Sequence, residues 1–286
     1  GEKRELPENN FLENTLKIEI AGEFSVTQLK VYGYPEADSQ YLFFVEFGGS
    51  QYPYIHVRIP PSGHDHIALN EAVPLVIEKT RAELEKYGKL IINADEVTCD
   101  TFDRHLYSVT GDRYATLPST IGCGVFYMTP SQRAALLEID VIAPAGFTLE
   151  PVDVDRDGEM IHRLWKNSMD LEITLNRLRS LPSICARNAD GEIAGWMMAA
   201  RYGQLTNLYT MPAYRNRGLG KAMEISVAKE FARRGLRVFK YVEPENSSVF
   251  ASSLSSDLWT LWTIKDGNSN EITPNMHIFR RFERVM

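Results

Sequence analysis

The residues with the clearest chemical meaning lie between Leu205 and Asn246, where a strand-like segment leads into a loop, a long helical pattern, a second strand and an Asn-led helix. Two glycines, Gly218 and Gly220, stand where the loop enters the first helix. Glycine lets a backbone come close to a phosphate, and the first amides of a helix point out of its positive end. The segment therefore predicts a cradle for a diphosphate group.

Two widespread phosphate loops do not fit this segment. A Walker loop needs a glycine where Arg215 stands. A dinucleotide-binding fingerprint needs glycines at the positions of Asn216 and Met223. Both motifs are excluded, and we expect Arg215, Arg217 and Lys221 to add positive charge around the cradle.

The run from Leu208 to Gly220, LYTMPAYRNRGLG, resembles the acyl-CoA-binding core of the GNAT superfamily of N-acyltransferases. Within that superfamily the chain is most similar to the glycine N-acyltransferase-like family, over Gly146 to Asp257. Further features that carry the resemblance are Gly146-Phe147, Trp165, Leu181-Pro182-Ser183, Gly195-Trp196, Arg234-Gly235 and the segment from Val242 to Asn246. The resemblance implies an α/β (α+β) fold with a mixed, splayed sheet flanked by helices.

The same resemblance implies that acyl-CoA, as acetyl-CoA or a longer thioester, is the co-substrate. Its pantetheine arm is expected along the edge of the strand before the loop, and its diphosphate over the loop amides. The residues implied in coenzyme binding are Leu208, Tyr209, Thr210, Arg215, Asn216, Arg217, Gly218, Leu219, Gly220, Lys221 and, from the next helix, Asn246. No metal ion is implied.

Acyl transfer to an amine needs a base, or a water relay to one, because a free amine is mostly protonated at neutral pH. In the glycine N-acyltransferases a glutamate on the strand before the loop is implied as this base, and Gln204 takes its place here. Gln204 cannot accept a proton, although its amide can hold a water or the incoming amine. Tyr241, Glu243 and His162 are candidate substitutes, but each also fits a simpler interpretation as a packing or surface residue.

The group that protonates the departing thiolate is also open. Many GNAT enzymes place a tyrosine in the helix after the Asn, and Ser253 occupies the matching position. A backbone amide near Tyr209 could stabilise the oxyanion without any particular side chain. The tentative catalytic set is therefore Gln204, Tyr241, Glu243 and Ser253.

Three functions are compatible with these residues. The first is transfer of an acyl group from the CoA thioester to a small-molecule amine or amino acid. The second is an acyl-CoA-binding protein, or pseudoenzyme, with little turnover. The third is an N-acetyltransferase that acts on proteins.

The elements that position these residues alternate along the chain. The pattern predicts strands over residues 26–32, 41–47, 54–59, 90–93, 123–128, 147–150, 183–187, 193–201, 205–210, 238–242, 258–264 and 276–282. It predicts helices over residues 70–87, 131–139, 157–166, 171–179, 218–234 and 246–256.

Pro144-Ala145-Gly146 is interpreted as a linker between two domains. Residues 1–143 would form an N-terminal α/β domain, which the string from Leu29 to Gly33 suggests is a degenerate GNAT-like domain. Residues 146–286 would form the C-terminal GNAT acyl-CoA-binding domain.

Three smaller patterns have plain interpretations. His64-Asp65-His66 could offer two imidazoles to zinc, but no third ligand is placed by the sequence, so a structural loop is favoured. The acidic run from Asp153 to Glu159 is interpreted as solvated surface at the start of a helix. Trp196-Met197-Met198 is interpreted as core.

Composition describes an ordinary globular protein. The chain has 286 residues, 31 Lys and Arg against 38 Asp and Glu, a formal charge of -7 and 44% hydrophobic residues. This balance argues against binding to nucleic acid or to an anionic membrane. Cys99, Cys123 and Cys185 are too few and too dispersed for a disulfide framework, which indicates a reducing compartment. We expect an intracellular protein, cytoplasmic or mitochondrial, that is a monomer or weak homodimer.

Overall fold

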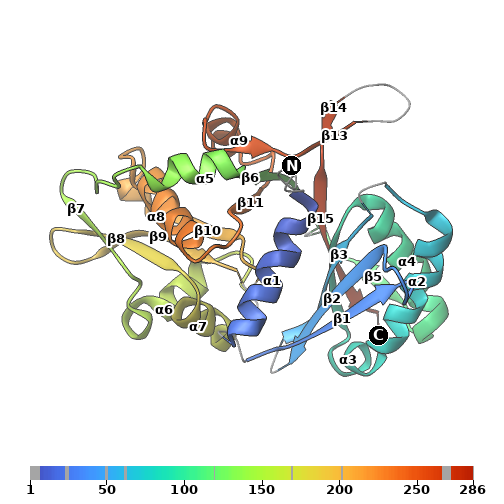
Figure 1. The fold of residues 1–286 in the computed structure, drawn as a ribbon. Helices are drawn as coiled ribbons and strands as arrows, with labels where there is room; N and C mark the ends of the chain where they lie inside the picture. Colours follow the sequence, from blue (N-terminus) through green and yellow to red (C-terminus); the bar gives the residue numbers. More distant parts are fainter. Residues whose placement is uncertain are drawn as a thin grey trace. The chain divides into compact units, whose positions relative to one another are not determined.

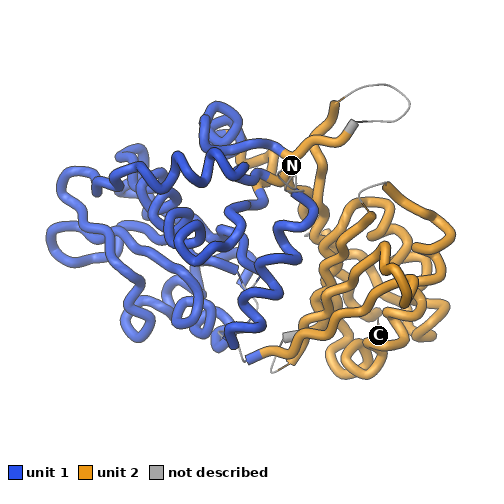
Figure 2. Tube along the Cα trace, in the orientation of Figure 1, with its two compact units in different colours: residues 1–26, 126–241, 248–261 blue, residues 27–125, 242–247, 262–286 orange. Residues whose placement is uncertain are grey.

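The chain forms two compact units, drawn in different colours in Figure 2. The computed structural model describes residues 7–22, 26–48, 51–60, 63–118, 120–168, 170–200, 202–265 and 272–285. Unit 1 consists of residues 1–26, 126–241 and 248–261, and unit 2 of residues 27–125, 242–247 and 262–286.

The units do not divide at the segment 144–146 that the sequence suggests, because both chain ends return to the other half. The C-terminal strand β15 (Met276–Arg284) pairs antiparallel with β4 (Lys89–Ala94), which makes it part of unit 2. The N-terminal helix α1 (Asn10–Ala21) belongs to unit 1. There the side-chain amide of Asn14 donates to the carbonyl oxygens of Gly203 and Arg237, each at 2.8 Å.

Unit 2 is a mixed sheet with helices on one face (Figure 1). Strands β1 (Gln28–Tyr34), β2 (Tyr41–Gly48) and β3 (Gln51–Arg58) form an antiparallel meander, and β4 adds parallel to β3. The order continues with β15 and the first part of β6 (Ile121–Tyr127), while β5 (Tyr114–Thr116) also pairs with β15. The remaining elements are α2 (His66–Lys79), α3 (Arg81–Tyr87), α4 (Glu96–Thr110) and the two-stranded sheet of β13 (Thr263–Lys265) and β14 (Ile272–Pro274).

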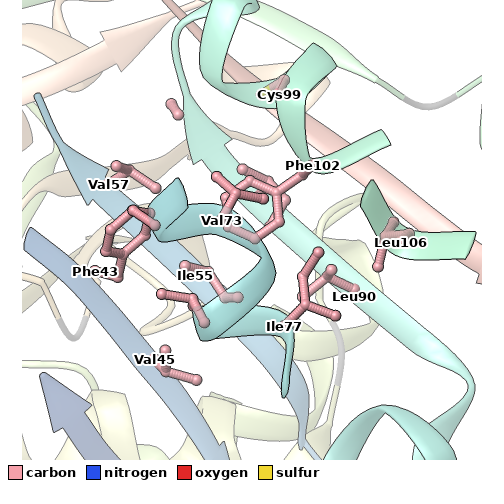
Figure 3. Packing of buried hydrophobic residues seen from close by; sticks show 14 of the residues in the cluster. Phe43, Val45, Ile55, Val57, Val73, Ile77, Leu90, Cys99, Phe102 and Leu106 are labelled. Carbon is pink, nitrogen blue, oxygen red and sulfur yellow. The ribbon is translucent and has the colours of Figure 1, made fainter. Parts of the chain in front are cut away.

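The core of unit 2 lies between this sheet and helices α2 and α4. Successive strand residues point to opposite faces, so alternate residues of β2 and β3 meet the helices. Figure 3 shows the side chains that converge there, which are Phe43, Val45, Ile55 and Val57 from the strands, Val73 and Ile77 from α2, and Cys99, Phe102 and Leu106 from α4.

The strands of unit 1 are also mixed, with antiparallel and parallel neighbours. Strands β7 (Phe147–Glu150), β8 (Ser183–Asn188), β9 (Ile193–Ala199) and β10 (Leu205–Thr210) are antiparallel in chain order. Strand β11 (Phe239–Val242) is parallel to β10, and β12 (Thr260–Leu261) pairs with the end of β6. The helical elements are η1 (Pro7–Asn9), α1, α5 (Pro130–Leu137), α6 (Val154–Leu164), α7 (Leu171–Ser180), η2 (Pro212–Tyr214), α8 (Leu219–Arg233) and α9 (Ser247–Leu254).

The core of unit 1 confirms the interpretation of Trp196 and Met198 as packing residues, because both side chains are fully buried. The Trp196 ring stacks on Tyr209 of β10 with 4.8 Å between the ring centres. The three cysteines are buried, as expected, and none forms a disulfide within the described residues. Burial raises the pKa of Cys99 to about 12 and that of Cys185 to about 11, so these two thiols stay protonated at neutral pH.

Several elements differ from the sequence prediction. The helix predicted over 70–87 is two helices that meet at Thr80, and helix α4 was not predicted. The strand predicted over 258–264 divides at Trp262 into β12 and β13, which belong to different sheets. The strand predicted over 193–201 ends at Ala199, and Arg201 lies outside the described residues. No helix in the described ranges has the length and apolar character needed to cross a bilayer.

Candidate functional site

The candidate site is built on β10, which carries a bulge. It pairs with β9 through Leu205↔Ala199 and Thr206↔Met198, and then again through Tyr209↔Trp196, so three steps along β10 match two along β9. Asn207 lies in this interval with a φ of 49°. A bulge bends a strand and redirects its side chains and backbone groups. The second part of β10 therefore departs from the line of its first part.

On its other side, β10 separates from β11 almost at once. The described residues of the two strands share one registered pair, Leu205↔Lys240. Beyond it, the edge of β10 from Asn207 to Thr210 faces a strand that does not pair with it. This splay is the feature that the predicted pantetheine site requires, because an extended, amide-containing arm can read an open strand edge.

The loop after β10 leads directly to an open helix start. Asn216 and Gly218 both adopt positive φ, 59° and 80°, and Gly218 caps α8 without a side-chain hydrogen bond. Ala222 is the first residue of α8 whose amide donates to a backbone carbonyl, that of Gly218 at 3.1 Å. Within the described part of the chain, the amides of residues 216–221 donate to no protein group. These are the amides that the sequence predicts for the cradle, and amides at a helix start without a protein acceptor can bind an anion.

Gly195 explains why the cradle lies so close to the edge of β10. A Cβ on Gly195 would come within 2.6 Å of the Tyr209 carbonyl oxygen and 2.9 Å of the Met223 side chain. No other residue fits there, so β9, β10 and α8 can approach each other only because this position is glycine. The packing holds the start of α8 beside the open strand edge.

The three cations that the sequence assigns to the cradle lie in the same loop and helix start. Arg215 donates from Nε to the Thr210 carbonyl oxygen at 3.1 Å, and Arg217 donates from Nη2 to the Ala213 carbonyl oxygen at 3.3 Å. These two arginines and Lys221 are exposed, and in the described residues none of them pairs with a carboxylate. Their charge is therefore not neutralised locally, and it favours an anionic ligand at the helix start.

Gln204 immediately precedes β10 and is 8% exposed. Its backbone oxygen accepts a hydrogen bond from the Ala200 amide at 2.9 Å. Its side-chain oxygen, Oε1, is buried and has no hydrogen-bond partner in the described structure. Gln204 thus stands at the closed end of the splay, next to the Leu205↔Lys240 pair.

The other tentative catalytic residues lie in different settings. Tyr241 of β11 is half-buried, with its ring edge-on to Phe239 at 5.9 Å between the ring centres. His162 of α6 shares a hydrogen bond with Thr174 Oγ1 of α7 at 3.0 Å, which joins the two helices. Ser253 is 2% exposed, and its hydroxyl donates to the Val249 carbonyl oxygen within α9. These contacts favour packing roles for His162 and Ser253.

Two predicted residues, Glu243 and Asn246, group with unit 2 rather than with the cradle. Glu243 is half-buried, and its carbonyl oxygen accepts the Asn246 amide at 3.0 Å. The Asn246 side chain is exposed. Their roles as base and as pantetheine contact stay predictions.

Sequence reasoning missed a buried ion pair at the root of the splay. Lys240 Nζ lies 2.6 Å from Glu224 Oε1 of α8 and 4.1 Å from the centre of the Trp259 ring. Burial lowers the pKa of Lys240, and the carboxylate of Glu224 partly opposes this shift. The pair ties α8 to β11 beside the residue at which the two strands part. The sequence did carry a signal for this pair, because a lysine inside the apolar run from Val238 to Val242 indicates a buried charge that needs a partner.

Unit 2 repeats the same order of elements, but its two parallel strands stay paired and the start of its helix is capped by a side chain. Strands β2 and β3 are antiparallel, and a loop and α2 then lead to β4, which is parallel to β3. In unit 1, β9 and β10 are antiparallel in the same way, and a loop and α8 lead to β11, which is parallel to β10. Strands β3 and β4 pair at three positions, from Tyr54↔Ile91 to His56↔Asn93. Asp65 caps α2, and its carboxylate accepts the amides of Ile67 and Ala68 at 3.0 and 3.1 Å. The start of α2 therefore already holds an anion of its own.

His64, one of the two histidines considered as zinc ligands, is instead part of a hydrogen-bonded chain. Its Nε2 lies 2.6 Å from Asp95 Oδ2, and its Nδ1 lies 3.3 Å from the Tyr41 hydroxyl. The described residues contain no cluster of three or more metal-ligating side chains. Burial by itself would raise the pKa of Asp95, but the hydrogen bond and charge of His64, with the Thr98 amide, outweigh it and lower that pKa.

This lowered pKa gives Asp95→Asn a pH-dependent effect on stability. A carboxyl with a depressed pKa stabilises the fold above its ordinary value of 3.8 and ceases to do so as the pH falls through the folded-state pKa. Asparagine keeps the cap of α4 but not the charge. We expect the variant to unfold more easily by about 1.5 kcal/mol at pH 7. Urea titrations should show this gap narrowing as the pH falls below 3.8, and a gap that does not change with pH would contradict the assignment.

Comparisons with known proteins agree with this geometry. The FR47-like protein family matches residues 184–254, which include β10, the cradle and α8. Glycine N-acyltransferase from Bos taurus is 27% identical over 108 residues, a match that covers 37% of this chain and 36% of the bovine protein. The chain thus matches only about a third of the length of that relative.

Solved structures show the fold. A Drosophila protein from a structural genomics programme superposes with a TM-score of 0.69 at 16% identity, over 99% of this chain and 91% of that one. The GCN5-related N-acetyltransferase from Kribbella flavida superposes with a TM-score of 0.53 at 11% identity, over 96% of this chain and 93% of that one. The predicted mixed α/β fold is confirmed by these similarities.

Proposed function

We propose that this chain, a protein of the GNAT superfamily, is an acyl-CoA-dependent N-acyltransferase whose acceptor is a small amine or an amino acid. The observation that carries the proposal is the open cradle of amides 216–221 beside the unpaired edge of β10. The start of α8 offers hydrogen-bond donors and positive charge to a diphosphate, and the edge of β10 offers backbone groups to a pantetheine arm. The similarity to glycine N-acyltransferase, 27% identity over 108 residues, supports the acceptor class.

In this proposal the chain acts mainly by holding its two substrates in place. The cradle amides, with Arg215, Arg217 and Lys221, would hold the diphosphate of acyl-CoA, and the edge from Leu208 to Thr210 would hold pantetheine. The thioester supplies the activated acyl group. A backbone amide near Tyr209 is our candidate to stabilise the oxyanion, because such donors act without a charged side chain.

Acyl-CoA binding without turnover is the second candidate, and Gln204 favours it. A side-chain amide at the entrance of β10 cannot take a proton from the acceptor. Turnover then depends on the acceptor arriving unprotonated, on a water relay or on another residue. A chain without any of these would bind acyl-CoA and release little thiol.

The two candidates are separated by thermal unfolding and thiol release measured on the same protein. A ligand that binds only the native state at a hundred times its Kd stabilises it by about 2.7 kcal/mol. We therefore expect CoA and acetyl-CoA to raise Tm by roughly 5 °C. Pantetheine, which lacks the diphosphate, serves as the control and should raise Tm much less.

Acetyl-CoA and benzoyl-CoA are then supplied with glycine and other amino acids, and the free thiol is followed. An amine-dependent release of thiol supports the enzyme. A thermal shift without release of thiol supports the binding protein. Absence of both a shift and binding heat with CoA would contradict the proposed function in either form.

A further inference from the structure

A buried oxygen without a partner lies where β10 begins. Gln204 is 8% exposed, and no described group donates a hydrogen bond to its Oε1. Buried side-chain oxygens in native proteins nearly always have a donor, so an exception at a candidate site calls for a ligand or a function. Gln204 Oε1 can therefore accept a hydrogen bond from an N–H group, and no described residue supplies one.

The place of Gln204 in the chain relates this residue to the acyl-transfer site. Gln204 is adjacent to Leu205, the one residue of β10 paired with β11, and the open edge of β10 runs onward from there. The splay therefore has the Gln204 position at its closed end and the cradle of α8 at the far end of β10. The reacting end of a ligand whose phosphates occupy the cradle would point along β10 toward Gln204.

We propose that Gln204 Oε1 accepts a hydrogen bond from the incoming amine, and that the chain takes this acceptor as its free base. The inference rests on the proposed function and narrows its substrate class. An amide oxygen can orient an N–H group but does not remove its proton at neutral pH. The preferred acceptor is therefore a primary amine of low basicity, such as the α-amino group of a peptide or of an amino acid amide, rather than a lysine-type alkylamine.

The chemical step balances without a side-chain base. The lone pair of the amine nitrogen forms a bond to the thioester carbonyl carbon, and the carbon–sulfur bond breaks. The proton that the nitrogen loses passes to the departing thiolate, directly or through water. The products are the N-acyl amide and the free thiol of CoA, and Gln204 holds the nitrogen without changing its own protonation.

The expected discrimination follows from acid–base equilibria. A peptide α-amino group has a pKa of about 7.7–8.0, and a lysine side chain has one of about 10.4. At pH 7 the two amines therefore differ roughly 300-fold in the fraction present as free base. Without a base on the protein, this difference should appear directly in kcat/KM.

The test uses acetyl-CoA as donor, with glycylglycine and Nα-acetyl-lysine amide as acceptors, and follows thiol release across pH. We expect kcat/KM at pH 7 to favour glycylglycine at least a hundredfold. Each profile should rise tenfold per pH unit and level off at the pKa of that acceptor. Gln204→Glu, which introduces a base, should make the two profiles level off at one lower pH that belongs to the protein.

Gln204→Met keeps the length of the side chain and removes its carbonyl. We expect it to raise KM for glycylglycine about tenfold, while the Kd of CoA stays unchanged. An unchanged KM together with a higher Tm would show that the unpaired oxygen is only a packing defect, and would overturn the proposal. A single protein pKa shared by both acceptors in the unmodified chain would overturn it as well.

These outcomes are distinct from failure of the proposed function. If CoA raises Tm but no amine releases thiol, the chain is a binding protein, and both the enzyme assignment and this inference fall. If thiol is released but Gln204→Met leaves KM unchanged and raises Tm, the enzyme assignment stands and only the inference falls. The same holds if both acceptors share a single protein pKa in the unmodified chain.

Discussion

Gly220→Asp is expected to weaken CoA binding strongly while leaving the fold intact. A Cβ on Gly220 would lie 3.7 Å from the Leu208 side chain and 3.9 Å from Thr210 Oγ1, which is ordinary contact, so the added β-carbon causes no clash. A carboxylate about 4 Å from the diphosphate would repel it by about 4 kcal/mol at an effective dielectric constant of 20. This corresponds to nearly a thousandfold weaker binding, which calorimetric titration with CoA would measure.

Stability and affinity should move in different directions in this variant. An acid in the first turn of a helix stabilises it by roughly 0.3–1 kcal/mol, so Tm without ligand should be equal or slightly higher. Gly220→Ala adds the Cβ without the charge and is the matched control, with a much smaller loss of affinity. If Gly220→Asp bound CoA as tightly as Gly220→Ala does, the diphosphate could not lie over the start of α8.

Arg187→Met should cost about 3–5 kcal/mol of unfolding free energy, which is the largest stability effect we expect from one substitution. Arg187 Nη2 lies 2.6 Å from Asp157 Oδ2, with the two side chains 5% and 6% exposed, and Arg187 also contacts Glu150. The hydrogen bonds to Asp157 and Glu150 raise the pKa of Arg187, and burial opposes them. Removal of the guanidinium would leave the buried Asp157 carboxylate without its close partner, and the nearest remaining charge would be the largely exposed Arg156, whose Nε lies 3.9 Å from Asp157 Oδ1.

Urea denaturation of the single and double variants tests this account. Arg187→Met combined with Asp157→Leu removes both charges, and we expect it to recover most of the lost stability. A single variant as stable as the unmodified chain would show that water reaches Asp157. The pair also corrects the interpretation of the acidic run at the start of α6, because Asp157 is 4% exposed and not solvated surface.

The cradle could be predicted from the sequence because it depends on local rules. Two glycines, a strand before them and a helix after them suffice to place Gly218 and the amides of residues 219–221. The structure agrees on β10 at both ends and on α8 within one residue at each end. The splay itself was available only through resemblance, since no local pattern tells whether two parallel strands stay paired.

Features that depend on distant partners were not predictable in this way. The unit boundary follows from the pairing of β15 with β4, between segments almost 200 residues apart. Helix α4 has a polar sequence with few apolar residues, and its N-cap Asp95 reads equally well as a loop residue. Lys240 lies on β11 and Glu224 on α8, and their pairing depends on how this strand and this helix pack together, which no local sequence pattern specifies.

The Asp65 carboxylate at the start of α2 has a consequence for chemical probes of this protein. It acts as an internal ligand for the second copy of the strand–loop–helix arrangement, in which β3 and β4 stay paired at three positions. A probe that carries a pyrophosphate like that of coenzyme A is therefore expected to bind at the start of α8 rather than at the start of α2.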